Sequence, residues 1–249
     1  MGVYRFSIEK RLETLKRKYI NDKILVEKST MHATSDLLKH FKLFKSLRVN
    51  DLEELARECQ VKRFARRAMI LTAGKKEKYI CFLFEGRLQG IDFTIDGREV
   101  GIYFVSPGDF CGELCIFDEG NQPEHVIALN SSVVVLIPTN TLRDVANLHP
   151  KVMTALGNKL ASRVRQMTLQ RSFLGLPNIP QRVCNQLWLF AEQTPVNSVN
   201  KIEIINAPTH MEIAIMLNIS RETVTRVFRN FTRKDSFRDG PNISYKRPE

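Results

Sequence analysis

Between residues 64 and 137 the chain alternates short runs of β-forming residues with glycine turns, and this alternation restricts the possible folds more than any other feature. Six runs cover residues 69–71, 79–84, 88–93, 100–105, 126–129 and 133–137. Five glycines punctuate them: Gly74, Gly86, Gly97, Gly108 and Gly120. Asp96-Gly97 is a typical tight-hairpin dipeptide. Many short strands with regular turns indicate an antiparallel sandwich or barrel.

A heptad pattern follows over residues 140–175, after a short first helix. The apolar residues of the expected dimer seam are Met153, Leu156, Leu160, Val164, Met167 and Leu174. A single buried helix could carry the same stripe, but flanking Arg and Lys residues favour a coiled coil between two chains. Pro177 and Pro180 then predict a break at residues 176–181, which we interpret as a hinge.

Residues 208–231 carry the signals of two short helices joined by a tight turn. Thr209 and Glu212, three residues apart, form a capping box at the start of the first helix. Asn218 tolerates the left-handed backbone of the turn, and Ser220 can cap the second helix. In the second helix Val224, Val227, Phe228 and Phe231 have the spacing of an inward face. This pattern predicts a helix-turn-helix.

The outer face of the second helix is suited to double-stranded DNA. Its polar residues are Arg221, Glu222, Thr225, Arg226 and Arg229. Arginine can bind the O6 and N7 atoms of guanine with two hydrogen bonds, and glutamate can accept one from N4 of cytosine. A helical hairpin with merely solvated charges is the alternative. This alternative is disfavoured because the capping box, the turn asparagine and the cap serine all stand at the positions that a helix-turn-helix requires.

The charge of the chain is distributed unevenly. The net charge is +11, yet residues 99–150 hold one basic and seven acidic residues, so the basic surplus lies towards both ends. Such asymmetry favours a nucleic-acid-facing part joined to a part with another role. Residues 1–34 are expected to be a basic helical extension, because Ile8, Leu12, Leu15 and Tyr19 recur at helical spacing.

The segment 220–226 resembles the recognition helix of the catabolite activator (cyclic-AMP receptor) and fumarate-nitrate regulator family of bacterial transcription factors. Residues 96–99, 106–110 and Gly112-Glu113-Leu114 resemble its cyclic-nucleotide-binding domain. The resemblance covers roughly residues 40–231 in the family's order. It implies an α+β chain whose sensor domain at 35–139 is a jelly-roll β-sandwich of the cyclic-nucleotide-binding kind. A dimerisation helix at 140–175, a hinge at 176–181 and a winged helix-turn-helix DNA-binding domain at 182–249 would follow. The wing would lie beyond residue 231, where only Ile243 and Tyr245 are strand-like.

The same resemblance implies a cytoplasmic, homodimeric transcription regulator. Arg221, Glu222 and Arg226 would read a TGTGA-like palindrome, and Thr209 and Ser220 would bind phosphates. The half-sites would lie one helical turn apart, about 34 Å. The expected partners are double-stranded DNA, a second copy of the chain and RNA polymerase.

The effector pocket implied by the resemblance departs from the family pattern. The expected pocket residues are Gly112, Glu113, Leu114, Glu124, His125, Met167 and Thr168. The family's Arg-Ser or Arg-Thr pair, which binds the cyclic phosphate, would fall at Pro123-Glu124 or Glu124-His125, and neither has the arginine. No Lys or Arg lies between Arg98 and Arg143, so a buried phosphate would lack a cation. We therefore expect no cyclic AMP and no other cofactor. Another small ligand, a cyclic dinucleotide at a different surface, and no effector at all remain open.

Other classes of function have little support in the sequence. There is no phosphate-binding glycine loop, nucleophile elbow or His-Glu-x-x-His motif, so we do not expect an enzyme. Five scattered cysteines and five histidines form no ligand motif, which predicts no metal site. The longest apolar stretch, 126–138, is interrupted at 130–132 and too short to span a membrane. The remaining alternative is a cyclic-nucleotide-fold adapter that acts on a protein partner.

Overall fold

The structure is a computed structural model, which describes residues 31–118, 120–192, 201–204, 207–232, 236–239 and 242–246. The chain forms two compact units that divide between Ser162 and Arg163, within one long helix. The helix expected in the basic extension lies outside the described residues, apart from positions 31–34.

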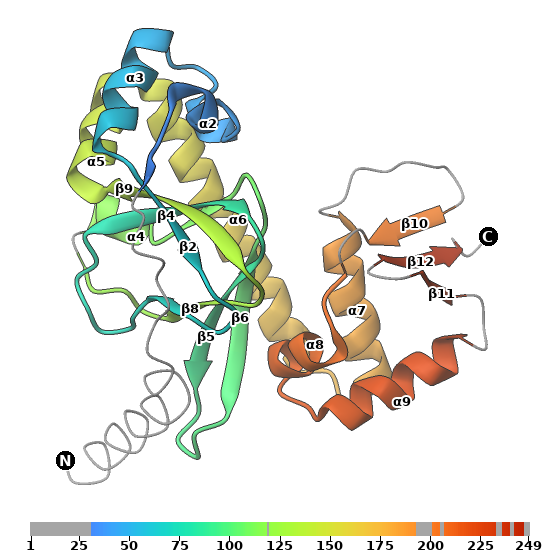
Figure 1. Cartoon of the computed structure of the whole chain (residues 1–249). Helices are drawn as coiled ribbons and strands as arrows, with labels where there is room; N and C mark the ends of the chain where they lie inside the picture. The colour runs from blue at the N-terminus through green and yellow to red at the C-terminus, as the bar shows by residue number, and fades with distance from the viewer. Residues whose placement is uncertain are drawn as a thin grey trace, which may run out of the picture. The chain divides into compact units, whose positions relative to one another are not determined.

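The first unit contains two antiparallel sheets (Figure 1). One has the strand order β1 (Met31–His32), β2 (Gln60–Phe64), β9 (Ser132–Pro138), β4 (Tyr79–Glu85), β7 (Phe110–Cys111). The other has the order β3 (Met69–Leu71), β8 (His125–Ala128), β5 (Leu88–Phe93), β6 (Glu99–Val105). The predicted sandwich is confirmed, and each of its six predicted runs coincides with a strand to within one residue at either end.

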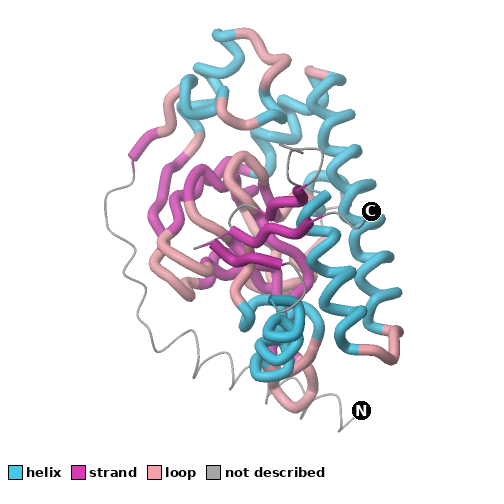
Figure 2. The backbone as a smooth tube through the Cα atoms, turned by 90° about the vertical axis from the view of Figure 1, so that its right-hand side faces the viewer, coloured by secondary structure: helices cyan, strands magenta, loops and turns pink. Residues whose placement is uncertain are grey.

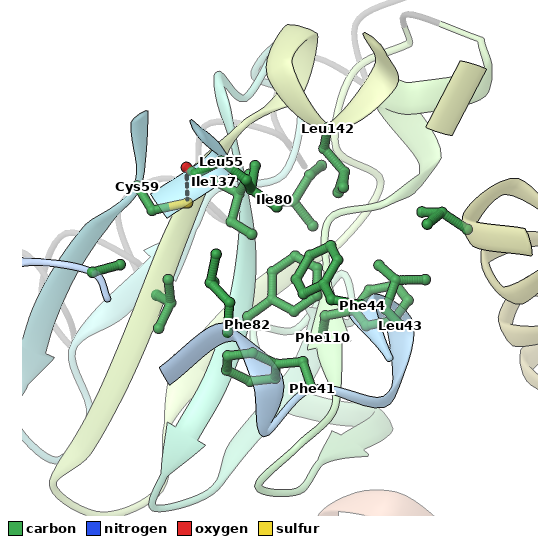
Figure 3. Packing of buried hydrophobic residues seen from close by; sticks show 14 of the residues in the cluster. Phe41, Leu43, Phe44, Leu55, Cys59, Ile80, Phe82, Phe110, Ile137 and Leu142 are labelled. Atoms are coloured by element: carbon green, nitrogen blue, oxygen red, sulfur yellow. Dashed lines mark hydrogen bonds between the residues drawn. The ribbon is translucent and has the colours of Figure 1, made fainter. Parts of the chain in front are cut away.

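The five-stranded sheet is buried on both faces, and strand β4 shows how. Cys81 and Leu83 face the other sheet, where they join the core between the two sheets. Ile80 and Phe82 face the opposite way, into a second core formed with the helices. Figure 3 shows this second core, in which the Phe82 ring stacks on Phe110 with centroids 4.9 Å apart. Successive residues of a strand point to opposite faces, so one strand serves two cores.

Six described helical segments contribute to that second core. They are α2 (Ser35–Lys39), η2 (Lys42–Phe44), α3 (Val49–Glu58), α4 (Leu114–Phe117), α5 (Thr139–Leu148) and α6 (Pro150–Leu174). Helix α4 follows strand β7 and supplies Cys115 and Ile116. Strand β1 pairs with β2, Met31 opposite Val61, so residues 31–34 lead directly into the sandwich and are not part of a separate extension.

Helix α6 begins at Pro150 and runs without a break to Leu174 (Figure 2). The heptad stripe correctly predicts this helix, but part of the predicted seam is wrong. Leu156 is fully buried in the core of its own first unit, and Met153 packs against that core. The Leu156 side chain is therefore unavailable to a second chain, whereas Met153 is only partly buried. Farther along, Val164, Met167 and Leu174 are 63%, 50% and 38% exposed, and Leu160 is half-buried.

The predicted hinge at residues 176–181 is too long. Helix α7 (Ile179–Glu192) already includes Pro180 in its first turn. Asn178 caps it, because its side-chain oxygen accepts a hydrogen bond from the backbone N–H of Gln181 at 3.4 Å. Proline is well tolerated in a first helical turn, where the missing N–H has no partner within the helix. The break therefore covers only residues 175–178.

The second unit packs helices against a small sheet. Its elements after α7 are β10 (Lys201–Ile204), α8 (His210–Leu217), α9 (Arg221–Thr232), β11 (Ser236–Asp239) and β12 (Asn242–Lys246). The strands lie in the order β10-β12-β11, and the β11–β12 hairpin supplies the expected wing. The Phe231 side chain lies outside the described part of the unit.

Candidate nucleic-acid interface and effector pocket

The first helix of the helix-turn-helix, α8, begins with the predicted capping box. The backbone N–H of Glu212 donates to Thr209 Oγ1 at 3.3 Å, and the backbone N–H of Thr209 donates to Glu212 Oε2 at 2.9 Å. Two backbone donors at the helix start are thereby satisfied reciprocally. Thr209 itself remains exposed at the N-terminus of α8, a position suited to a phosphate.

The turn between α8 and α9 has the predicted left-handed residue. Asn218 has φ +52° and ψ +46°, a conformation that asparagine adopts more readily than most other residues. The backbone N–H of Ile219 then donates to the carbonyl of Ala214 at 3.0 Å. Ala214 is buried at this crossing, so the two helices pack at the point where the sequence places a small side chain.

Helix α9 separates its apolar and polar residues cleanly. Ser220 caps it by accepting a hydrogen bond from the backbone N–H of Thr223 at 3.1 Å. The core of this unit contains Val224, Val227 and Phe228 from α9, together with Val183 and Leu187 from α7 and Ile213 and Leu217 from α8. The described residues left exposed are Ser220, Arg221, Glu222, Arg226, Arg229 and Asn230. Three cations and one carboxylate therefore line the outer face of α9.

Thr225 differs from the other predicted DNA-contacting residues. Its hydroxyl donates to the backbone carbonyl of Arg221 at 2.9 Å, and the same oxygen lies 3.0 Å from Nδ1 of His210 on α8. The side chain is half-buried. The structure therefore engages the Thr225 hydroxyl within the protein, whereas Arg221, Glu222 and Arg226 remain exposed.

The predicted effector-pocket residues of the Gly112–Leu114 segment do not all face the same way. Gly112 has φ +86°, and a Cβ there would lie 3.0 Å from Leu71 Cδ1, so glycine fits the turn best. Glu113 is buried, with 1% exposure. Leu114, the first residue of the short helix α4, is 38% exposed.

Side chains of the protein itself fill the space beside Glu124. The Tyr103 ring packs against the core between the sheets, and its hydroxyl makes a short hydrogen bond to Glu124 Oε1. Gln122 Nε2 donates to the same oxygen at 2.9 Å. On the neighbouring strand, a Cβ on Gly90 would lie 2.7 Å from the Tyr103 ring. The missing side chain of Gly90 thus makes room for the ring, and both donors to the Glu124 carboxyl are neutral.

His125 lies at the start of strand β8. Its Nδ1 accepts a hydrogen bond from the backbone N–H of Ala73 at 3.1 Å, and its ring meets the edge of Phe93 with centroids 5.7 Å apart. Glu124 lies directly before β8 and bonds Tyr103 and Gln122, whereas His125 is the first residue of β8 and contacts Ala73 and Phe93, so the two side chains have different partners. Met167 and Thr168 are exposed on α6, and the Thr168 hydroxyl donates to the carbonyl of Val164 at 2.9 Å.

Sequence reasoning missed Tyr103, Gln122 and Gly90. Gly90 lies inside the strand run 88–93, and a glycine within a strand is a local signal for a close approach by another group. Tyr103 and Glu124 are 21 residues apart, so their hydrogen bond becomes visible only when the strands pair.

The described residues contain no group of three His, Cys, Asp or Glu side chains placed to hold a metal ion. All five cysteines are free; Cys184 is exposed and the other four are buried. Burial raises the pKa of the Cys59 thiol to about 12. Among the described helices, none is long and apolar enough to cross a membrane.

Comparisons with known proteins agree with this architecture. The family model of the cyclic nucleotide-binding domain matches residues 61–149, and that of the Crp-like helix-turn-helix domain matches residues 181–249. The structure titled as the c-di-GMP-responsive global regulator CLP of Xanthomonas campestris aligns with a TM-score of 0.63 at 17% identity, covering 81% of this chain and 100% of that one. At that identity the similarity establishes the fold.

Two curated relatives extend the similarity to sequence. The cAMP-activated global transcriptional regulator CRP of Pasteurella multocida is 25% identical over 186 residues, covering 72% of this chain and 85% of that protein. The cAMP-activated global transcriptional regulator Vfr of Pseudomonas aeruginosa is 26% identical over 187 residues, covering 74% and 87%. The chain therefore belongs to the Crp/Fnr family of transcription regulators, with a cyclic nucleotide-binding-like domain followed by a helix-turn-helix DNA-binding domain.

Proposed function

We propose that this chain binds a palindromic DNA site as a homodimer and regulates transcription there, with RNA polymerase as its protein partner. The observation that carries the proposal is the face of α9, where Arg221, Glu222 and Arg226 are exposed opposite a fully apolar inner face. The capped N-termini at Thr209 and Ser220 lie at the starts of both helices and would bind backbone phosphates.

The residue types on α9 support a TGTGA-like half-site. Arginine recognises guanine through O6 and N7, and glutamate accepts from cytosine N4, so Arg221, Glu222 and Arg226 suit a half-site with G·C pairs at fixed positions. Each such contact contributes about 1–3 kcal/mol of discrimination against a wrong base pair.

The exposed part of α6 supports the dimer. Val164, Met167 and Leu174 expose apolar surface along one helix, and burial of this surface against a second copy would remove it from water. A twofold dimer places its two recognition helices about 34 Å apart, one turn of DNA.

The filled space beside Glu124 supports an effector other than cyclic AMP, or none. A cyclic phosphate beside Glu124 would meet a buried carboxyl group, and residues 99–142 contain no Lys or Arg. It would also have to displace the Tyr103 ring. Both steps cost free energy without a compensating ion pair.

The test is fluorescence anisotropy with a labelled TGTGA palindrome and a scrambled duplex, comparing Arg221→Ala with Arg229→Ala. Both arginines are exposed on α9, but Arg229 lies in its last turn. We expect R221A to lose at least tenfold in preference for the palindrome while retaining weak, salt-sensitive binding, and R229A to retain the preference. Wild-type preference in R221A would refute the assignment, and absence of any DNA binding by the wild type would favour the adapter.

A further inference from the structure

We propose that His210 is a positioning residue for DNA recognition, which sets the recognition helix α9 against α8 through Thr225 and Phe228. The inference rests on the proposed function, because it assigns His210 a role in base reading without contact to the bases. His210 is the first residue of α8, directly after the Thr209 cap.

The hydrogen bonding of Thr225 determines the direction of its contact with His210. The Thr225 hydroxyl donates its one hydrogen to the carbonyl of Arg221, 2.9 Å away. The same oxygen can then only accept from His210 Nδ1, which lies 3.0 Å from it. His210 must therefore carry a hydrogen on Nδ1, and the direction of the bond is fixed by the geometry of its partner.

A second contact restricts the helix further. The His210 ring lies over the Phe228 ring, with centroids 4.5 Å apart and planes inclined by 33°. Thr225 and Phe228 are three residues apart and are neighbours on one side of α9. One side chain of α8 therefore holds two adjacent positions of α9, a polar one and an apolar one, and opposes both rotation and sliding of that helix.

These contacts connect the two DNA-facing parts of the domain. A chain of three groups leads from the Arg221 carbonyl through the Thr225 hydroxyl to His210, next to the proposed phosphate ligand Thr209. Paired hydrogen bonds to a base require heavy-atom distances near 2.9 Å and good angles. A small rotation of α9 would therefore weaken base reading more than it weakens contacts to phosphates.

The experiment compares four variants on the palindrome and the scrambled duplex. His210→Leu keeps bulk without a donor, His210→Asn places an amide nitrogen near the position of Nδ1, Thr225→Val removes the acceptor, and the double variant combines H210L with T225V. We expect H210L and T225V each to lose about tenfold in preference for the palindrome, the double variant to lose no more than either, and H210N to restore most of the preference. Binding to the scrambled duplex and its salt dependence should stay unchanged.

Circular dichroism melts of each variant separate folding from positioning. Two results at unchanged melting temperature would overturn the proposal. In the first, the double variant loses the product of the two single losses in preference for the palindrome. In the second, H210N has as little preference as H210L. Equal preference in the wild type and H210L would overturn this proposal alone. A wild type with no preference would overturn the proposed function and this inference together.

Discussion

At the scale of single residues, Gly90 decides which group occupies the space beside Glu124. A side chain at this position would collide with the Tyr103 ring, because an added Cβ would lie 2.7 Å from it. Overpacking of a filled core costs about 1–3 kcal/mol. This overpacking cost should disappear when the Tyr103 ring is removed, so a second substitution at Tyr103 can test it.

We predict that Gly90→Ala lowers the free energy of unfolding by about 1–3 kcal/mol in the wild type and by much less in a Tyr103→Ala background. Urea unfolding followed by fluorescence measures both differences. Gly157→Ala is the matched control: no atom lies within 4 Å of the added Cβ, and the residue is in helix α6, so this change should stabilise by about 0.5–1 kcal/mol. Equal losses for G90A in both backgrounds would contradict the packing account.

The cysteines offer a second test at this scale. The thiolate is the reactive form, and burial raises the pKa of Cys59 to about 12, so this thiol stays neutral at pH 8. Cys184 is exposed, although desolvation also raises the pKa of its thiol. We predict that a disulfide reagent at pH 8 labels one thiol per native chain, slowly, and that Cys184→Ser removes this reaction. Labelling of the other four should require denaturant.

Local residue patterns predict those features of the candidate site that depend on near neighbours. The capping box at Thr209 and the left-handed Asn218 involve contacts over three or four residues, and the sequence predicts both correctly. The Tyr103–Glu124 bond and the His210–Thr225 bond join residues 21 and 15 positions apart. They depend on strand register and on helix crossing, which no local pattern contains.

At the scale of elements, helix α6 shows the limit of a periodic pattern. The heptad stripe predicts a helix correctly, but the stripe does not indicate which core its residues enter. Leu156 is buried in its own unit because the turn at His149–Pro150 folds the start of α6 onto the helical core, whereas Val164 remains exposed.

This difference yields opposite effects of two substitutions. Leu156→Ala should lower the stability of the chain by about 2–5 kcal/mol through a core cavity, at any protein concentration. Val164→Glu should leave the unfolding of the first unit unchanged but shift the chain towards the monomer. Equilibrium ultracentrifugation together with urea unfolding measures both properties. A fully dimeric V164E of wild-type stability would show that this part of α6 is not the seam.

At the scale of the whole chain, the order of the parts follows from the sequence, because each part has its own period. Apolar residues recur every two positions in the strands of the sandwich and every three or four positions in the helices. The two family models match the sandwich region and the helix-turn-helix region. The sequence pattern does not predict strand β2, because only two of its five residues, Val61 and Phe64, are apolar and buried. The polar residues Gln60, Lys62 and Arg63 interrupt the apolar signal. Its position becomes evident only from its pairing with β9.

The most direct test of the central claim is fluorescence anisotropy on the TGTGA palindrome, first without ligand and then with cyclic AMP and cyclic di-GMP added separately. We predict that specific binding seen without ligand is unchanged by cyclic AMP, because Tyr103 and Glu124 fill the site and residues 99–142 contain no Lys or Arg to bind a phosphate. Specific binding that arises only with cyclic AMP would contradict the account.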